Sequence, residues 1–161
     1  MATALPAGPY PLVFVAYNTI FNLLTEEAQR ACFAAVTSRL TPGGRFAVEA
    51  FVPDDPARSG SSVDVKALTA DRVVLDVARY DAGTQRAEGQ FVELTEAGGV
   101  RLRPWAIRWA SPAQLDQLAG AAGLELEARS ADWDGATFTE ESDHHVTIYR
   151  VPHRSPDAGV G

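Results

Sequence analysis

Two short apolar segments separated by one amphipathic segment constrain the fold of this chain more than any other feature. The first, Leu12–Tyr17 (LVFVAY), is a continuous apolar run and predicts a strand that is buried on both faces. The second, Arg45–Phe51 (RFAVEAF), follows the glycine turn at Pro42–Gly44. With a helix between them, the two strands predict a βαβ unit and therefore a parallel sheet.

The segment between the two strands carries the signals of a helix. Thr25 is a good N-cap residue, and Glu26 and Glu27 place acidic groups in the first turn, where the helix dipole favours them. From there to Leu40 the apolar residues recur at helical spacing. Cys32 lies on this apolar stripe and is expected to be a small core side chain.

After a polar loop at Pro53–Ser62, the pattern changes to closely spaced strands. The predicted strands are Arg72–Tyr80, Arg86–Thr95 and Val100–Trp109. The turns between them are so short that neighbouring strands must be antiparallel, and a change of apolar phase at Pro104 predicts a β-bulge. The sequence thus predicts an antiparallel β-meander at about residues 63–110.

A second helix and two further strands complete the predicted elements. Ser111 and Gln114 form a capping box with proline at the first helical position, and Gly123 ends this helix. The closing strands are predicted at residues 124–129 and 146–151, and residues 152–161 are expected to be a disordered tail.

Composition excludes several classes of partner. The formal charge is −7, and the 14 basic residues include a single lysine, Lys66. Nucleic acid and anionic membrane surfaces require clustered positive charge, so neither is an expected partner. No apolar run approaches the ~20 residues that span a bilayer. With one cysteine and no basic leader, we expect a cytoplasmic protein.

Taken in order, these elements resemble the C-terminal half of a class I S-adenosylmethionine-dependent methyltransferase. Gly8–Leu24 (GPYPLVFVAYNTIFNLL) resembles the fourth strand of the family and the loop after it. Leu40–Phe51 (LTPGGRFAVEAF) resembles the fifth strand, and Ser142–Val151 (SDHHVTIYRV) resembles the last, antiparallel strand. The meander resembles the substrate lid of small-molecule members such as sugar and glycine N-methyltransferases.

The resemblance implies an α/β fold with a partial Rossmann-like sheet, equivalent to strands 4 to 7, and an inserted antiparallel β-meander. The expected domain covers residues 1–151. The implied cofactor is S-adenosylmethionine and the implied substrate is a small molecule. Such a methyl transfer works mainly by proximity and orientation, so no catalytic residue is predicted.

By the same resemblance, the loop after Leu12–Tyr17 would contact both ligands. Tyr17 and Asn18 are the candidate cofactor contacts. The candidate substrate contacts are Thr19, Phe21, Trp105, Arg108 and Trp109. The structural alternatives are that Asn18 caps a turn, that Phe21 packs under the lid, and that the tryptophans and arginines (Arg101, Arg103 and Arg108) belong to an amphipathic strand that covers the core.

Two departures from the family pattern bear on the cofactor. The sequence contains no G-x-G-x-x-G motif, with which the family approaches its nucleotide closely. Pro11 stands where the family usually has an aspartate. The sequence alone therefore predicts an incomplete cofactor site.

The incomplete sheet that the resemblance implies would leave Leu12–Tyr17 as an uncovered apolar edge. We expect a homodimer, an exchanged segment or a complementing chain to pair with this edge. The alternatives are a cofactor-free binding or regulatory subunit, a non-methylating enzyme that uses the lid pocket, and an incomplete gene product.

The remaining polar motifs have simpler explanations. Asp132–Gly135 (DWDG) could supply a carboxylate base, but turn chemistry accounts for the same residues. His144 and His145 are neighbours on a predicted strand, so their side chains point to opposite faces and cannot ligate one metal ion together. No metal site and no nucleophile–base pair is predicted.

Overall fold

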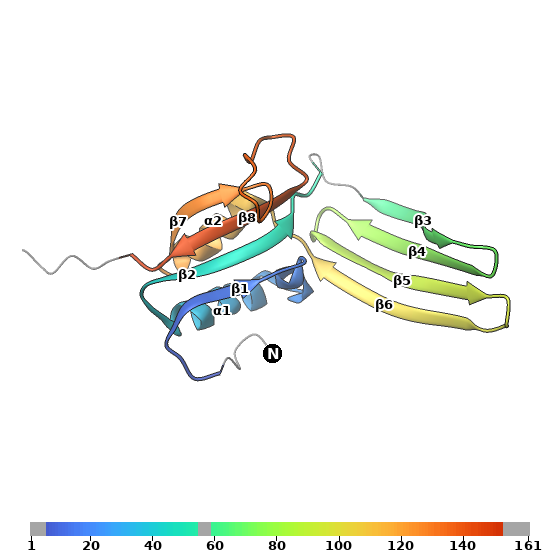
Figure 1. Ribbon diagram of the computed structural model, residues 1–161, viewed down its shortest axis with the longest axis horizontal. Helices are drawn as coiled ribbons and strands as arrows, with labels where there is room; N and C mark the ends of the chain where they lie inside the picture. Colours follow the sequence, from blue (N-terminus) through green and yellow to red (C-terminus); the bar gives the residue numbers. More distant parts are fainter. Residues whose placement is uncertain (1–5, 55–58, 153–161) are drawn as a thin grey trace, which may run out of the picture. The chain divides into compact units, whose positions relative to one another are not determined.

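The computed structural model describes residues 6–54 and 59–152 of the 161-residue chain (Figure 1). The chain divides into two compact units, one made of Met1–Val52 with Ser111–Gly161 and the other of Pro53–Ala110. The elements are β1 (Tyr10–Val15), η1 (Thr19–Asn22, a 3-10 helix), α1 (Glu26–Thr37), β2 (Leu40–Phe51), β3 (Gly60–Leu68), β4 (Arg72–Asp81), β5 (Arg86–Thr95), β6 (Val100–Arg108), α2 (Pro112–Ala121), β7 (Glu125–Ser130) and β8 (His144–Arg150).

The first unit contains a four-stranded sheet in the order β1-β2-β8-β7. β1 and β2 are parallel, and β8 is antiparallel to both of its neighbours, which confirms the predicted βαβ unit and the antiparallel last strand. β2 begins at Leu40, so Pro42–Gly44 lies inside the strand rather than ending the helix, which is a correction. Gly43 adopts a φ of 72°, a left-handed conformation that favours glycine.

Both helices begin where their capping residues predict. The Thr25 side chain accepts a hydrogen bond from the Ala28 N–H at 3.1 Å. At α2 the Ser111 hydroxyl accepts from the Gln114 N–H at 3.2 Å, while the Ser111 N–H donates to Gln114 Oε1 at 2.9 Å. α1 ends at Thr37, three residues before the predicted end, because the chain must turn into β2.

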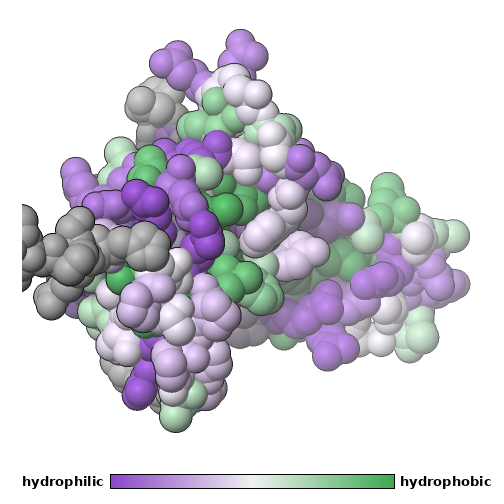
Figure 2. All heavy atoms as spheres, turned by 60° about the vertical axis from the view of Figure 1, so that its left-hand side comes forward, coloured by the Kyte–Doolittle hydropathy of each residue, from purple (hydrophilic) through white to green (hydrophobic). Residues whose placement is uncertain are grey.

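One face of this sheet forms the core. The Phe33 ring of α1 packs edge-on against Phe46 of β2 and Tyr149 of β8, with centroid distances of 5.2 and 5.9 Å. The opposite face is open at β1, where Leu12 and Phe14 are 53% and 64% exposed. The prediction that this strand is buried on both faces is therefore wrong: Figure 1 shows α1 and α2 on the same side of the sheet. Figure 2 shows one face of the molecule, where exposed apolar residues (green) lie among polar residues (purple).

The second unit is a four-stranded antiparallel sheet in the order β3-β4-β5-β6, which we call the lid sheet. Its last three strands are the predicted ones, and β3 is an additional strand that the polar Gly60–Ser62 concealed. The predicted bulge at Pro104 is wrong, since β5 and β6 pair without interruption from Arg86↔Arg108 to Leu94↔Val100. Pro104 is tolerated because β6 is an edge strand and needs no further N–H there.

None of the helices in residues 6–54 and 59–152 has the length and apolarity needed to cross a membrane. Pro152 follows β8, and the rest of the predicted tail, residues 153–161, lies outside the described residues.

Candidate functional site

The carboxyl ends of the parallel strands β1 and β2 meet at an unusual loop. Tyr17 and Asn18, which follow β1, have φ values of 52° and 59°. Two consecutive residues other than glycine in the left-handed region are uncommon, because the Cβ crowds the backbone there. Such local strain persists only where surrounding contacts enforce it, and it is concentrated at functional sites.

Three hydrogen bonds from β2 hold this loop in place. Asn18 Oδ1 accepts from the Phe51 N–H at 2.6 Å, and the Asn18 N–H donates to the Glu49 carbonyl at 3.3 Å. The Tyr17 N–H donates to the Glu49 carboxylate, Oε2, at 2.9 Å. Sequence reasoning missed Glu49, although an acidic residue inside the apolar strand RFAVEAF is the signal that could have identified it.

The side chains of the loop divide between solvent and core. Tyr17 is 87% exposed, and Thr19 is exposed while its hydroxyl donates to the Ala16 carbonyl at 2.6 Å. Phe21 is fully buried and packs edge-on against Phe51, with a centroid distance of 5.0 Å. The Asn18 side chain does not cap the 3-10 helix η1, so the capping alternative is wrong; its bond goes to β2 instead. Tyr17 and Thr19 are thus the loop side chains that reach solvent.

Trp105 belongs to the lid sheet and is fixed there by two contacts. Its indole Nε1 donates to Asp76 Oδ1 at 2.9 Å, and Asp76 is nearly buried. The ring lies over Gly89, where a Cβ atom would stand 2.7 Å from the ring and 2.5 Å from the Val77 carbonyl oxygen. Glycine is therefore required at this position so that the tryptophan can lie flat on the sheet.

The lid residues expected to bind substrate do not share one face. Along β6, side chains alternate, so Arg103 and Trp105 lie on one face and Arg108 on the other. Arg108 donates to the Gln85 side chain at 3.3 Å, and Trp109, after the strand, is 5% exposed. The expected wall of tryptophan and arginine therefore includes Arg103 but not Arg108.

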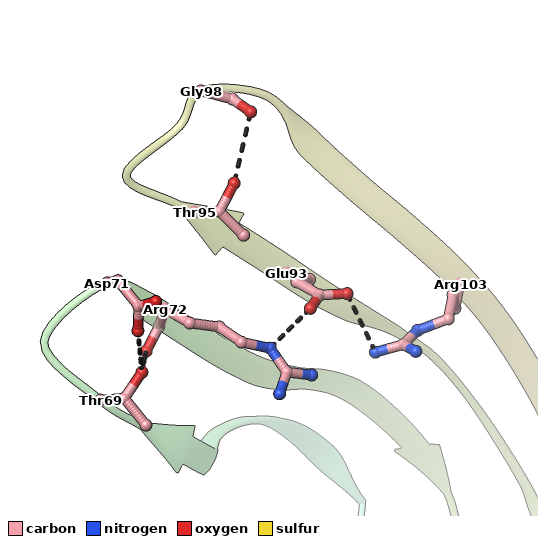
Figure 3. A network of polar contacts seen from close by, with 7 residues as sticks. All are labelled: Thr69, Asp71, Arg72, Glu93, Thr95, Gly98 and Arg103. Atoms are coloured by element: carbon pink, nitrogen blue, oxygen red, sulfur yellow. Dashed lines mark hydrogen bonds and ion pairs between the residues drawn. The ribbon is translucent and has the colours of Figure 1, made fainter.

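A charged network crosses the face of the lid sheet that carries Trp105 (Figure 3). Oε1 of Glu93, on β5, accepts a hydrogen bond from Arg72 Nε of β4 at 2.6 Å. The other carboxylate oxygen, Oε2, lies 3.6 Å from a guanidinium nitrogen of Arg103 on β6. The same side of the sheet also carries the buried Val74, Ala78 and Ala87, so the ion pairs lie beside the most buried residues of the lid sheet.

A second network lies under α2 in the first unit. The Asp116 carboxylate accepts from Arg129 at 2.5 Å and from the Tyr149 hydroxyl at 2.8 Å. Arg129 also donates through Nε to Thr147 Oγ1 at 2.8 Å. His145 Nδ1 lies 2.8 Å from the same hydroxyl. Sequence reasoning missed this network, although His145, Thr147 and Tyr149 alternate along β8 and so share a face.

Burial shifts the titration of two members of this network. The pKa of His145 is lowered to about 4 by desolvation and by the nearby Arg129 guanidinium. The pKa of Tyr149 is raised by desolvation and by the Asp116 carboxylate. His145 Nε2 is buried and has no hydrogen-bond partner among the described residues. His144 is exposed beside Asp143 at 3.0 Å, so the two histidines do face opposite ways.

The other candidate groups are structural. The Asp132 carboxylate accepts from the N–H groups of Asp134 and Ala136, both at 3.0 Å, which is the turn chemistry that the sequence suggested as the alternative. Cys32 is half-buried, and burial raises the pKa of its thiol. Within residues 6–54 and 59–152, no group of three or more His, Cys, Asp or Glu side chains is arranged to hold a metal ion.

Comparison with solved structures places the fold among methyltransferases. The CcbJ methyltransferase from Streptomyces caelestis is 34% identical with a TM-score of 0.88. A S-adenosylmethionine-dependent methyltransferase from Clostridium acetobutylicum is 8% identical with a TM-score of 0.80. CalS10, an amino pentose methyltransferase from Micromonospora echinaspora, is 19% identical with a TM-score of 0.65. The alignments cover 94%, 94% and 93% of this chain.

The chain has a class I methyltransferase fold, as the sequence resemblance predicted. It spans 62%, 63% and 61% of the length of the three structures. No protein-family model matches the sequence, and no curated protein sequence matches it significantly.

Proposed function

We propose that this chain forms the substrate side of a S-adenosylmethionine-dependent methyltransferase that acts on a small molecule. The observation that carries the proposal is the strained Tyr17–Asn18 loop, held by Glu49 and Phe51 at the carboxyl ends of two parallel strands. Ligands of open α/β sheets bind at this edge. The 34% identity to CcbJ supports the same conclusion.

The residues at this edge fit one side of the cofactor. Asn18 uses both its backbone N–H and its side-chain oxygen within the fold, so its role is to shape the loop. Tyr17 and Thr19 are exposed and can contact the bound cofactor or the substrate. When bound, S-adenosylmethionine supplies an electrophilic methyl group, and these residues would orient the acceptor towards it.

The remaining cofactor contacts require residues outside this sequence. The chain contains no G-x-G-x-x-G turn, and it spans about three fifths of the methyltransferases that it resembles. We propose that a complementing chain, or a longer form of this one, supplies the nucleotide-binding part. It would pair with β1, the outer strand of its sheet, and cover the exposed Leu12 and Phe14.

A chimera tests this proposal. The chain is joined behind the part of CcbJ that it does not cover, and S-adenosylhomocysteine binding is measured by isothermal titration calorimetry. We expect saturable binding by the chimera and none by the chain alone. With S-adenosylmethionine and a panel of small-molecule amines and alcohols, the chimera should release S-adenosylhomocysteine.

Two variants locate the binding in the loop. In the chimera, Asn18→Ala should weaken S-adenosylhomocysteine binding by about tenfold, equivalent to one lost hydrogen bond in the loop. Asn22→Ala, at an exposed position of η1, should leave binding unchanged. A folded chimera that binds no cofactor would favour the cofactor-free binding subunit, and stoichiometric binding by the isolated chain would contradict the need for a second part.

A further inference from the structure

Trp133 differs from the other two tryptophans of the chain. Trp105 donates its indole N–H to Asp76, and Trp109 is 5% exposed. Trp133 is 54% exposed, and it makes no hydrogen bond or ring contact with any residue in 6–54 and 59–152. An indole that lies half in water with its N–H unused is available to bind a ligand.

Trp133 lies in the connection between β7 and β8, residues 131–143, which we call the β7–β8 connection. β7 is antiparallel to β8, and β8 is antiparallel to β2, so β7 runs in the same direction as β1 and β2. The carboxyl ends of these three strands therefore lie at one edge of the sheet. Figure 1 shows the β7–β8 connection, in orange, at this edge. Trp133 and the Tyr17–Asn18 loop thus share the edge where open α/β sheets bind their ligands.

The strand register places the two loops level with each other. Glu49 of β2 pairs with Val146 of β8, and Val146 pairs on its other side with Ser130, the last residue of β7. The Asn18 N–H donates to the Glu49 carbonyl, so Asn18 continues the same row beyond β2. The row crosses three strand intervals, roughly 14 Å at the usual spacing of neighbouring strands. The loop after β1 and Trp133, three residues beyond Ser130, follow the two ends of this row.

The turn that carries Trp133 is held by backbone and small polar groups. Asp132 Oδ1 accepts from the N–H groups of Asp134 and Ala136, both at 3.0 Å. The Ser130 hydroxyl donates to the Asp132 carbonyl at 2.6 Å. None of these bonds involves the indole, so the turn fixes the position of Trp133 without depending on its side chain.

A second aromatic residue anchors the same connection to the core. The Phe138 ring lies edge-on to the buried His145, with a centroid distance of 6.3 Å. The Arg129 guanidinium carbon lies 5.5 Å from the centre of the Phe138 ring. The β7–β8 connection therefore already has an apolar anchor, and the half-exposed Trp133 is not needed as a second one.

We propose that Trp133 binds the acceptor substrate by stacking on an aromatic ring that is remote from the methylated atom. The inference rests on the proposed function, in which the loop after β1 orients the acceptor towards the methyl group. An acceptor that reaches from that loop to Trp133 is extended, with its ring on the order of 10 Å from the methylated atom. Offset or edge-to-face packing of two aromatic rings stabilises such a contact. Trp133 is thus a specificity-determining residue and takes no part in the chemical step.

The charge of the β7–β8 connection restricts the acceptor further. Residues 131–143 contain no lysine or arginine, and their five carboxylates are those of Asp132, Asp134, Glu140, Glu141 and Asp143. A field of one sign raises the local concentration of ligands of the opposite charge and repels those of the same charge. We therefore expect an amine as the acceptor and not a carboxylic acid or a phosphate ester.

A matched pair of amines tests the proposal. 6-Phenylhexylamine and hexylamine differ only in the aromatic ring, and their binding to the CcbJ chimera saturated with S-adenosylhomocysteine is measured by isothermal titration calorimetry. We expect 6-phenylhexylamine to bind about fivefold more tightly, the gain of one aromatic pair. Trp133→Ala should remove this difference, and Trp133→Phe, which keeps a ring, should retain most of it. Thr137→Ala, at an exposed position of the same connection, is the control and should leave the difference unchanged.

Two further measurements separate a role in binding from a role in the fold. In Trp133→Ala the affinity for S-adenosylhomocysteine and the urea midpoint should both stay at their wild-type values, and a lowered midpoint would assign the residue to the fold and overturn the inference. A chimera that binds S-adenosylhomocysteine but binds neither amine, or both equally, would overturn the inference and leave the proposed function standing. A chimera that binds no S-adenosylhomocysteine would overturn both.

Discussion

The side-chain oxygen of Asn18 and the backbone N–H of Phe51 are joined by a 2.6 Å hydrogen bond that ties the end of β1 to the end of β2. The backbone pairing of the two strands ends at Val15↔Val48, and this side-chain bond extends their connection beyond the last pair. The same residue adopts a φ of 59°, and the tie therefore also stabilises a left-handed conformation.

Two substitutions at Asn18 separate the hydrogen bond from the backbone strain. Asn18→Gly removes the side chain but favours positive φ, so it should cost only the hydrogen bond, about 1 kcal/mol. Asn18→Ala also brings the left-handed strain, for a total of about 2–3 kcal/mol. Urea unfolding followed by circular dichroism measures both, and equal losses for the two variants would contradict the argument.

Acidification should destabilise the chain through His145. Its pKa is lowered from 6.5 to about 4 in the folded state, so between these values the unfolded chain binds more protons than the folded one. The contribution of His145 to the free energy of unfolding is therefore fully present above pH 6.5. It decreases by up to about 3 kcal/mol as the pH falls to 4. Urea midpoints measured from pH 7.5 to pH 4 check the expected slope.

Variants of the two adjacent histidines test whether His145 causes this pH dependence of stability. His145→Asn, which cannot take up a proton in this range, should flatten the pH dependence even if it lowers stability overall. His144→Asn should keep the slope, since His144 is exposed. If both variants retain the wild-type slope, the acid sensitivity belongs to carboxylates elsewhere.

Local signals predicted the helices and the parallel pair well, because their information is contained in neighbouring residues. The Ser111–Gln114 capping box and the Thr25 cap each involve residues three apart in sequence. The predictions that were wrong depended on contacts between residues far apart in the sequence. Whether Leu12–Tyr17 is covered on both faces depends on where α1 and α2 pack. The run of apolar residues does not predict the placement of the helices.

The site residues show the same difference between local signals, which the sequence reveals, and long-range contacts, which it does not. Asn18 was identified from its position after a strand, but the groups that hold it, the Glu49 carbonyl and the Phe51 N–H of β2, are more than 30 residues away in the sequence. The lid sheet gives a second example: Trp105 and Arg108 are three residues apart on β6, so regular alternation places their side chains on opposite faces, and they cannot belong to one binding wall.

The Asp116 network should respond unequally to the loss of its members. Tyr149→Phe removes one donor from a carboxylate that keeps Arg129, and should cost about 1 kcal/mol. Asp116→Ala leaves the largely buried Arg129 guanidinium without its counter-charge, and should cost about 3 kcal/mol or more. Thermal unfolding checks this order, with Gln117→Ala on the exposed side of α2 as the neutral control.

Two glycines of ordinary backbone conformation should respond in opposite directions to alanine. At Gly89 the added Cβ would lie 2.5 Å from the Val77 carbonyl oxygen and 2.7 Å from the Trp105 ring, so the lid sheet must distort. Gly89→Ala should destabilise by about 1–3 kcal/mol, the usual range for overpacking. At Gly120, within α2, the Cβ meets open space, and Gly120→Ala should stabilise by about 0.5–1 kcal/mol through helix propensity.

Trp105 reports on the first of these changes directly. Because its ring lies over Gly89, its fluorescence should shift to longer wavelength in Gly89→Ala as the indole moves towards solvent. Gly89→Ala combined with Trp105→Leu should recover only part of the lost stability, since the closer obstacle is the backbone carbonyl of Val77 and no side-chain truncation removes it. Full recovery in the double variant would instead assign the whole cost to the tryptophan ring.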